Sequence, residues 1–400
     1  MTERVVIVGA GQAAGVAAVT LREQGYGGAI AIVGEEAFAP YQRPPLSKHF
    51  LAGQMSAEQL LLKPEKFYAE RNIELKLGTR VDAIERDVMR VRFNGGETLA
   101  YSKLLLATGS RPRKLSVPGA DLAGVHYLRT LADVQAIRAD MAAGKRAVVI
   151  GAGYIGLEAA AVAAKAGMNV VVLEAAERIL GRVSGPIVAD FFAEAHRAQG
   201  AEIHCGMRIE ALEGSARVAS VVCNEGPVAA DLVIVGIGID PNVELAAEAG
   251  LACDNGIVVD EFTRTADPNI HAAGDCSNHP NALLGARMRL ESVQNAIDQA
   301  RAAASNLAGK ERAYAELPWF WSNQYDLRLQ IAGLSQGHDG TLMRGSPAAR
   351  AFSVMYLRAG RLIAVDTVNA PRDHLAFRKL LAAGGEADAQ RLVDPAVAIG

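Results

Sequence analysis

Residues 146–158 read RAVVIGAGYIGLE, and residues 4–15 read RVVIVGAGQAAG. Each stretch is a short apolar run, then closely spaced glycines, then residues that favour a helix. This order predicts a buried strand, a glycine turn and the start of a helix, and the chain contains it twice. Strands and helices alternate after both stretches, so we expect two domains of the same plan, each built on a parallel sheet.

The glycines of the second stretch are Gly151, Gly153 and Gly156. In a dinucleotide fingerprint, the first glycine makes the tight turn, the second lets the backbone approach a pyrophosphate, and the third lets the helix lie close to the strand. Free N–H groups at the start of the helix favour the phosphates. Glu174 ends the next predicted strand, 169–173, where a carboxylate accepts hydrogen bonds from a ribose and repels a 2′-phosphate. We therefore predict an NADH site.

The first stretch carries Gly9 and Gly11, with Ala14 at the third position and an additional Gly15, and Glu35 follows the predicted strand 29–33. One such pattern is weak evidence, because any tight strand-to-helix turn can contain it. Two patterns, each with an acid after the next strand, indicate two dinucleotides in one protein. FAD and NADH are a natural pair, since hydride passes between nicotinamide and flavin.

The rest of the chain adds elements around these two units. A hairpin is expected around the NGGE turn at 94–97, and a long helix over 292–307. After Pro318 the residue pattern changes to that of short strands in which apolar and polar residues alternate. These include a hairpin at 351–369 with Ala-Gly at its turn. Further strands are expected near 73–77, 80–85 and 88–93 and within 103–113, 230–242 and 266–276, and helices over 157–166 and 371–382.

Composition narrows the function classes. Hydrophobic residues make up 50% of the chain, aromatic residues 5%, and the net charge is −3, so no basic face for nucleic acid is expected. No apolar run reaches 18 residues, and the chain enters its first strand without a leader. The four cysteines form no CxxC pair and the histidines no metal pattern. We expect a cytoplasmic protein with reduced thiols and no metal, membrane or nucleic-acid site.

The ordered motifs resemble the FAD-dependent pyridine-nucleotide reductases over nearly the whole chain. Within that superfamily they are similar to the ferredoxin reductases of cytochrome P450 and ring-hydroxylating oxygenase systems, to rubredoxin reductases and to apoptosis-inducing-factor-like proteins. The motifs are VVIVGAGQAAG (5–15), PYQRPPLSK (40–48), ATGSRPR (107–113), VVIGAGYIGLE (148–158), AAGDC (272–276), ESVQNAIDQA (291–300) and PWFWSNQYD (318–326).

The resemblance implies an α/β fold with two Rossmann-like domains, as in glutathione reductase, and a C-terminal α+β domain. It implies a discontinuous FAD domain, an inserted NADH domain and a C-terminal domain, at 1–112 plus 242–316, 113–241 and 317–400. The disulfide-reductase relatives keep a cysteine pair after the first unit, whereas this chain has no cysteine before Cys205. A thiol relay is therefore not expected, and electrons should leave the flavin directly.

Several residue roles follow from the resemblance. Lys48 is expected near flavin N5 and O4, although composition alone would make it an ordinary surface lysine. Glu158 is expected to face the nicotinamide side and to pair with Lys48, and Arg43 to neutralise FAD phosphates. Asp275 also lies after a predicted strand, at a ligand position of a parallel sheet, and is expected to bind the ribityl chain.

The remaining expected contacts lie on other segments. The N–H of Val293 is expected to meet the flavin pyrimidine. Trp321 is expected to cover the flavin edge, with core packing as the alternative for a tryptophan. The other expected cofactor contacts are Val81, Ala107, Arg129, Tyr154, Ile155 and Gly238.

The activity implied is NADH-dependent reduction of a [2Fe–2S] ferredoxin that serves a cytochrome P450 or another oxygenase. Docking is expected near Arg289, Trp321 and Arg328, on a monomer or a weak homodimer. A rubredoxin acceptor, an NADH oxidase or other small-acceptor reductase, and a redox-sensing protein like apoptosis-inducing factor are the alternatives.

Overall fold

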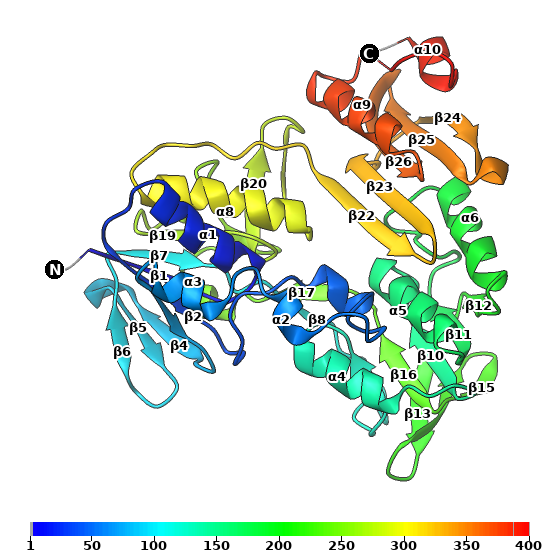
Figure 1. The fold of residues 1–400 in the computed structure, drawn as a ribbon, viewed down its shortest axis with the longest axis horizontal. Coiled ribbons are helices and arrows are strands. Elements are labelled where there is room, and N and C mark those ends of the chain that lie inside the picture. Colours follow the sequence, from blue (N-terminus) through cyan, green and yellow to red (C-terminus); the bar gives the residue numbers. More distant parts are fainter. Residues whose placement is uncertain (1–2, 387, 400) are drawn as a thin grey trace. The chain divides into compact units, whose positions relative to one another are not determined.

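The computed structural model describes residues 3–386 and 388–399, which group into two compact units (Figure 1). The first unit contains the chain up to Arg43, with Ala57–Arg111 and Asp240–Pro318. The second unit contains Pro44–Ser56, Pro112–Ile239 and the chain from Trp319 onward. Each unit holds one of the two glycine turns.

The first unit is built on a parallel sheet with the strand order β19-β7-β1-β2-β3. Valine, isoleucine and leucine fill the inner strands, which are buried on both faces as such a sheet requires. The strands are β1 (Arg4–Val8), β2 (Ala29–Val33), β3 (Ile73–Lys76), β7 (Lys103–Leu106) and β19 (Ile270–Ala272). The predicted parallel sheet is thus confirmed.

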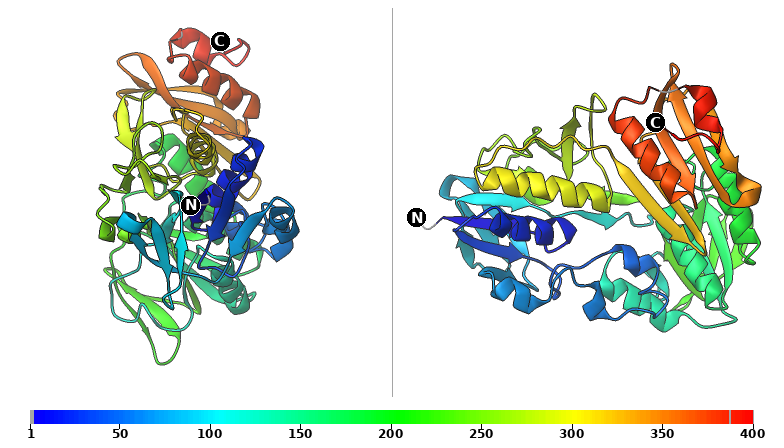
Figure 2. Two further views of the ribbon diagram at one scale, coloured as in Figure 1. Left: turned by 90° about the vertical axis from the view of Figure 1, so that its left-hand side faces the viewer. Right: turned by 45° about the horizontal axis from the view of Figure 1, so that its top comes forward.

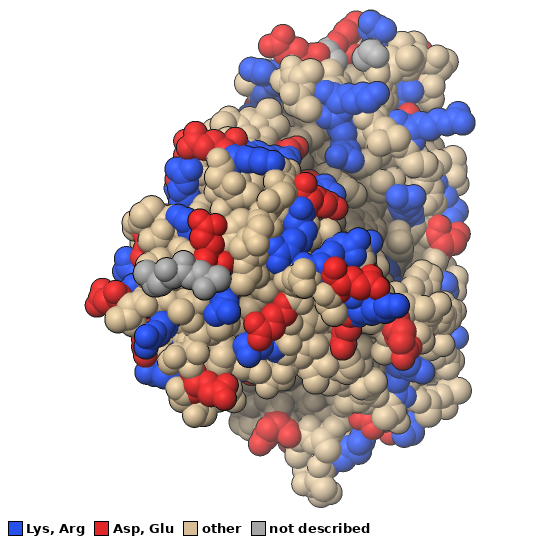
Figure 3. All heavy atoms as spheres, turned by 60° about the vertical axis from the view of Figure 1, so that its left-hand side comes forward, with Lys and Arg blue, Asp and Glu red and all other residues tan. Residues whose placement is uncertain are grey.

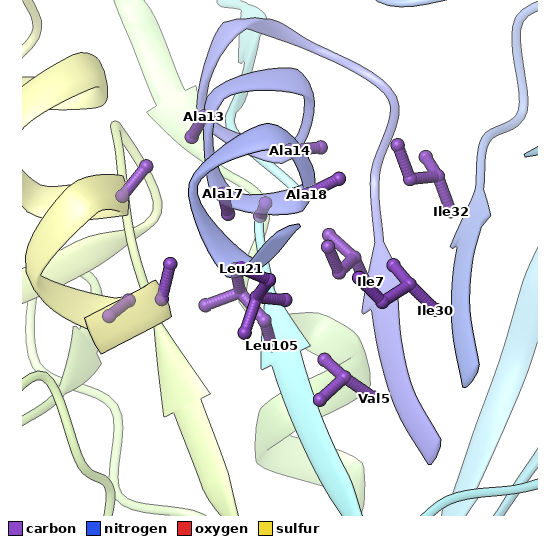
Figure 4. Packing of buried hydrophobic residues seen from close by; sticks show 14 of the residues in the cluster. Val5, Ile7, Ala13, Ala14, Ala17, Ala18, Leu21, Ile30, Ile32 and Leu105 are labelled. Atoms are coloured by element: carbon purple, nitrogen blue, oxygen red, sulfur yellow. The ribbon is translucent and has the colours of Figure 1, made fainter. Parts of the chain in front are cut away.

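Helices α1 (Gln12–Glu23) and α8 (Val293–Leu307) lie side by side on one face of this sheet (Figures 1 and 2). The side chain of Ser292 caps α8 by accepting the N–H of Asn295 at 3.1 Å, which confirms the predicted helix. Small side chains let α1 approach the strands closely. Figure 4 shows this packing among Ala13, Ala14, Ala17, Ala18 and Leu21 of α1 and Val5, Ile7 and Leu105 of the sheet.

An antiparallel sheet covers the other face, where Val6 and Leu104 pack with Ile84 and Val91. Its strands are β4 (Val81–Glu85), β5 (Arg90–Phe93) and β6 (Thr98–Ala100). The predicted NGGE turn joins β5 to β6. Strand β5 begins later than expected, because a 3₁₀ turn precedes it. The unit also contains α2 (Ala57–Leu60), α3 (Glu65–Ala69), α7 (Glu244–Glu248), β18 (Ile257–Val258), β20 (Ser277–Asn281) and β21 (Ala286–Met288).

The second unit repeats the parallel sheet, with the strand order β12-β11-β10-β16-β9. Its strands are β9 (Val125–Tyr127), β10 (Arg146–Ile150), β11 (Asn169–Glu174), β12 (Glu202–Cys205) and β16 (Leu232–Val235). Helices α4 (Leu131–Asp140), α5 (Tyr154–Lys165) and α6 (Pro186–Arg197) and the antiparallel strands β13 (Ile209–Gly214), β14 (Val218–Cys223) and β15 (Gly226–Ala229) complete this part.

In both sheets, the glycine turn follows a central strand. Strand β1 lies between β2 and β7, and β10 lies between β11 and β16. The strand order therefore changes direction at β1 and at β10, which makes the carboxyl end of each a topological switch point. Ligands of open parallel sheets bind at such a point.

A third sheet, antiparallel and in the order β22-β23-β26-β25-β24, also belongs to the second unit. Helix α9 (Pro371–Ala382) packs against β23 and β26, as Figure 1 shows, which confirms the predicted α+β class. Ala359 and Gly360 both have positive φ at the predicted hairpin turn. The strands are β22 (Trp319–Gln324), β23 (Leu327–Gly333), β24 (Gly340–Ser346), β25 (Ala351–Arg358) and β26 (Arg361–Val368), followed by α10 (Ala389–Val393).

Helix α5 touches both β22 and the 3₁₀ helix η1 (Pro44–Ser47). Residues 44–56 and the C-terminal sheet therefore group with the second glycine turn. Strands β8 (Ser110–Pro112) and β17 (Ile239–Pro241) pair as a two-stranded sheet where the chain changes unit. The division into FAD, NADH and C-terminal domains stays a prediction.

Both helices begin directly after the second glycine of their turns. Helix α1 begins at Gln12 and α5 at Tyr154, rather than at 157. The reason is that Gly11 and Gly153 are the N-cap residues, with extended backbones and no side-chain cap. The third fingerprint position therefore lies inside the first turn of each helix.

Candidate functional site

The second glycine turn has the steric features of a dinucleotide fingerprint. Gly151 has a φ of +100°, and a Cβ there would clash with the carbonyl oxygen of Gly236. A Cβ at Gly156 would clash with the carbonyl oxygen of Gly151, so the helix lies against its own turn. At Gly153, by contrast, a Cβ would meet no atom within 4 Å. Gly151 and Gly156 thus permit close packing, and Gly153 borders open space at the start of α5.

The first turn repeats two of these environments. Gly9 has a φ of +110°, and a Cβ there would clash with the carbonyl oxygen of Ala107. A Cβ at Gly11 would meet no atom within 4 Å. The third position differs, because Ala14 is fully buried and a Cβ at Gly15 would lie 2.8 Å from Pro40 and Leu62. The open space at Gly11 and Gly153 lies at helix starts with free N–H groups, so both turns fit a pyrophosphate.

The two acids expected near ribose have different surroundings. Glu174 accepts the N–H of Ala152 at 2.6 Å and the N–H of Ala176 at 2.8 Å, one on each carboxylate oxygen. Each oxygen keeps a lone pair for a hydroxyl donor. Glu35 lies two residues beyond β2, is 72% exposed, and approaches Arg80 at 3.4 Å. The predicted contacts with ribose are compatible with both positions.

Lys48 and Glu158 form the ion pair that the resemblance implied. The Lys48 Nζ atom lies 2.5 Å from Glu158 Oε2, and the side chains are 13% and 1% exposed. Ser47 donates its hydroxyl to the same oxygen at 2.5 Å, and Ser322 donates to Glu158 Oε1 at 2.6 Å. A buried carboxylate needs such donors, since an unpaired buried charge is costly. The expected roles toward the cofactors stay predictions.

Arg43 and Asp275 share the first unit. Arg43 lies 2.6 Å from Glu36 and 2.9 Å from the Tyr41 hydroxyl, and Ser110 donates to Asp275 at 2.8 Å. Burial lowers the pKa of Arg43, but Tyr41, Glu36 and the nearby Asp275 outweigh it and raise that pKa overall. Arg43 therefore remains a cation beside Asp275, which suits a site for an anionic cofactor.

The structure places the other expected FAD contacts on both units. Val81 begins β4 and Val293 begins α8, in the first unit. The first unit also holds Ala107, whose carbonyl is the group that Gly9 accommodates. The second unit holds Trp321 on β22, half-buried, and Arg129, whose backbone N–H donates to Asp133 at 3.1 Å.

The other expected NADH contacts surround the second turn. Tyr154 and Ile155 are the first residues of α5, and Ile155 is exposed. The Tyr154 ring packs on Phe320 of β22, with their centroids 4.7 Å apart. Gly238 has a positive φ, and its carbonyl accepts the N–H of Arg113 at 2.9 Å.

The sequence reasoning missed four polar groups that the structure connects to Glu158. Ser47 and Ser322 donate to it directly, Gln324 donates to Ser322 at 3.1 Å, and His196 lies 2.8 Å from Gln324. The alternation of Ser322 and Gln324 in a predicted strand places both on one face, which was an available signal. Their partners were not readable from the sequence.

The sequence analysis expected neither a membrane span nor a metal site. Within residues 3–386 and 388–399, no helix is both long and apolar enough to cross a membrane. In the same ranges, no group of three or more His, Cys, Asp and Glu side chains is arranged to hold a metal ion. The four cysteines carry free thiols.

Residues 3–300 match the family model described as pyridine nucleotide-disulphide oxidoreductase, and residues 319–400 match the one described as reductase C-terminal. The chain belongs to this pyridine nucleotide-disulphide oxidoreductase family. It is 46% identical over 380 residues to rhodocoxin reductase of Rhodococcus erythropolis, covering 94% of this chain and 89% of that protein.

Two further comparisons concern putidaredoxin reductase. The chain is 46% identical over 376 residues to the protein of Pseudomonas putida, covering 92% of this chain and 89% of that protein. The crystal structure of the covalent putidaredoxin reductase–putidaredoxin complex matches with a TM-score of 0.97 at 44% identity, covering 99% of this chain and 97% of that one. The predicted fold class and family are therefore confirmed.

Proposed function

We propose that this protein is a ferredoxin reductase that takes hydride from NADH and delivers single electrons to a ferredoxin of an oxygenase system. The observation that carries the proposal is the pair of glycine turns, each with open space at the N-cap glycine of its helix. Two dinucleotides held in one chain are what hydride exchange requires. The relatives named for electron transfer to small redox proteins support the same class.

The first unit would hold FAD. Gly11 and the start of α1 would face its pyrophosphate, Arg43 its phosphate charge and Asp275 its ribityl hydroxyls. When bound, FAD supplies the chemistry of accepting a hydride and releasing two electrons one at a time. The chain binds and orients the group, and the charge of Lys48 is proposed to favour an anionic reduced ring.

The second unit would hold NADH. Gly153 and the start of α5 would face the pyrophosphate, and Glu174 would accept the ribose hydroxyls while repelling a 2′-phosphate. Glu158 is a positioning group rather than a proton donor, because hydride transfer itself needs no acid or base at that place. Its ion pair orients Lys48.

A [2Fe–2S] ferredoxin is the proposed partner, with rubredoxin as the second candidate. Ferredoxins are usually acidic, so local cations would steer docking. Trp321 lies on β22 and the exposed Arg328 on the neighbouring β23. Burial, and then Arg378 and Arg328, lower the pKa of His374, so both cations lie within electrostatic reach of this buried ring.

The other proposed docking residue, Arg289, is 10% exposed and lies 2.7 Å from Glu291, so its contacts favour a structural role. On the face drawn in Figure 3, basic and acidic side chains are interspersed, so local groups would carry the steering there. The monomer or weak dimer and the cytoplasmic location expected from the sequence stay predictions.

The test is steady-state NADH oxidation by the flavin-loaded protein, with cytochrome c as final acceptor, with and without a [2Fe–2S] ferredoxin from an oxygenase system. A large ferredoxin-dependent increase supports the proposal. Fast NADH loss to oxygen or quinone, indifferent to ferredoxin, would instead establish a small-acceptor reductase. Slow turnover with every acceptor, together with a change of molecular size on adding NADH, would establish a redox sensor.

A further inference from the structure

A hydrogen-bond chain runs through the second unit from Tyr325 to Glu158. The Tyr325 hydroxyl lies 3.1 Å from His196 Nδ1, and His196 Nε2 lies 2.8 Å from Gln324 Oε1. Gln324 Nε2 lies 3.1 Å from the Ser322 hydroxyl, which lies 2.6 Å from Glu158 Oε1. The four residues from His196 to Glu158 are fully or almost fully buried. All four contacts join side chains, so they are separate from the backbone hydrogen bonds of α5, α6 and β22.

The direction of every bond in this chain follows from the groups involved. The Gln324 carbonyl only accepts, so His196 Nε2 must carry a proton, and Nδ1 then accepts from Tyr325. Burial lowers the pKa of His196, which keeps the ring neutral, and raises the pKa of Tyr325 to about 12. The Gln324 amide donates to Ser322, which leaves the serine proton for Glu158. All donors therefore point toward the carboxylate.

The second oxygen of the carboxylate is also fully engaged. Ser47 and Lys48 both donate to Glu158 Oε2 at 2.5 Å. Among the described residues, the ionisable groups around Glu158 include Lys48 from the loop, Tyr154 earlier on α5 and His196 behind Gln324. Asp366 of β26 also acts on Tyr154. The orientation of the Lys48 side chain depends on its contact with the Glu158 carboxylate.

We infer that Ser322, Gln324 and His196 are positioning residues that hold Glu158 ionised and in the rotamer that receives Lys48. The C-terminal sheet thereby supports the charge proposed to act on the flavin, and this inference rests on the proposed function. Without the Ser322 hydroxyl, Glu158 Oε1 loses a donor, and a buried carboxylate that loses a donor binds a proton more readily. The ion pair then becomes dependent on pH.

The test uses the flavin-loaded protein with Ser322→Ala, and the infrared band of a protonated carboxyl is followed from pH 5 to pH 9. Asp366, whose pKa burial raises to about 7, gives a band of its own in the unaltered protein. The expected result is therefore an additional band, seen in the difference between Ser322→Ala and the unaltered protein, that appears as the pH falls and is absent from the double variant with Glu158→Gln. A plot of the flavin midpoint potential against pH should show an additional change at the pH where this band appears. Gln324→Leu should move both readouts in the same direction by a smaller amount, and Ser322→Thr should restore the behaviour of the unaltered protein.

Ser353→Ala is the matched control, because it removes another fully buried serine of the same sheet, one bonded to Thr367 at 3.3 Å. If the effect came only from removing a buried serine of this sheet, Ser322→Ala and Ser353→Ala would change the infrared band and the flavin potential equally. That result would overturn the inference. An unchanged infrared spectrum and potential in Ser322→Ala would overturn it too.

Lys48→Ala separates this inference from the proposed function. If Lys48→Ala shifts the potential while Ser322→Ala leaves it unchanged, the inference fails and the role of Lys48 survives. If Lys48→Ala leaves the flavin absorbance, the potential and the rate of reduction by NADH unchanged, the proposed role of Lys48 fails and the inference falls with it. Ferredoxin-dependent turnover by the unaltered protein reports separately on the proposed function.

Discussion

The two glycine turns share a backbone and differ in their side chains. In each, a glycine with positive φ lies against a carbonyl of a neighbouring segment, Ala107 for Gly9 and Gly236 for Gly151. The acids that follow are unlike, since Glu174 bonds to two backbone N–H groups and Glu35 is mostly exposed. Under the proposed function, the shared part would serve the pyrophosphate, which is common to both dinucleotides, and the part that varies would face the groups that distinguish them.

The third fingerprint position extends this comparison. In the second unit, Gly156 lies against its own turn, so α5 approaches β10 closely. In the first unit, Ala14 occupies that position, and Gly15 instead meets Pro40 and Leu62. The close contact of α1 is therefore made with the segment that leads to the PPLSK motif. The two turns share the spacing of their first two glycines and differ in packing after them.

The largest expected effect comes from the shared part. Gly9→Ala and Gly151→Ala combine positive φ with a backbone clash, so each should lower the free energy of unfolding by about 3 kcal/mol or more. Gly25→Ala is the control, because its φ is +84° but a Cβ there would meet no atom within 4 Å. Urea unfolding measures all three. Equal losses in Gly9→Ala and Gly25→Ala would show that close approach is not what the turn requires.

The two units should respond to pH with opposite signs. Burial raises the pKa of Asp366 in the second unit to about 7 from its ordinary value of 3.8. Burial, with Lys103 and Arg264, lowers the pKa of His271 in the first unit to about 4 from 6.5. The folded state thus binds the Asp366 proton more tightly and the His271 proton less tightly than the unfolded chain. Asp366 therefore costs stability as pH rises from about 4 to 7, and His271 costs stability as pH falls from about 6.5 to 4.

Each dependence should approach about 1.4 kcal/mol per pH unit at its steepest. Asp366→Asn should remove the loss of stability that accompanies a rise in pH from about 4 to 7, and His271→Gln the loss that accompanies a fall from about 6.5 to 4. The measurement is the free energy of unfolding in urea at a series of pH values. Parallel curves for a variant and the unaltered protein would contradict the assigned protonation state.

Substitutions at Gly11 and Gly153, which both border open space, should affect the binding of different cofactors. Gly11→Ala should reduce the flavin retained per protein, and Gly153→Ala should raise the KM for NADH, each by about tenfold or 1.4 kcal/mol. Both variants have room for a Cβ, so their unfolding should change far less than that of Gly9→Ala. Visible absorbance and steady-state kinetics measure the two effects. A loss of flavin in Gly153→Ala, with NADH binding intact, would reverse the assignment of cofactors to units.

The smallest effects concern the acids. Glu174→Ala should cost about 1 kcal/mol of stability, because two backbone N–H groups lose their acceptor, and it should narrow the preference for NADH over NADPH. Glu35→Ala should change the unfolding free energy by less than about 0.5 kcal/mol, because the side chain is exposed. An unaltered ratio of kcat/KM for NADH and NADPH in Glu174→Ala would remove the ribose assignment.

The local pattern determined much of the fold and part of the site. Alternating apolar runs and glycine turns predicted the strands Arg4–Val8, Ala29–Val33 and Asn169–Glu174, and the repeat predicted two sheets of one plan. These features are readable because burial and turn geometry depend on neighbouring residues. The start of α5 was placed too late, at 157 rather than at Tyr154, because the N-cap geometry of Gly153 depends on the turn as a whole.

Only the tertiary structure decided which distant groups meet. The sequence shows Ser322 and Gln324 in one motif and His196 far away, without a sign that they bond to each other and to Glu158. It likewise gives no reason for Pro44–Ser56 to group with the second unit. A hydrogen bond depends on separation within about 3 Å and on direction, and both are set by the packing of helices and strands far apart in the chain. Local spacing decides what each element is, and packing decides which side chains act together.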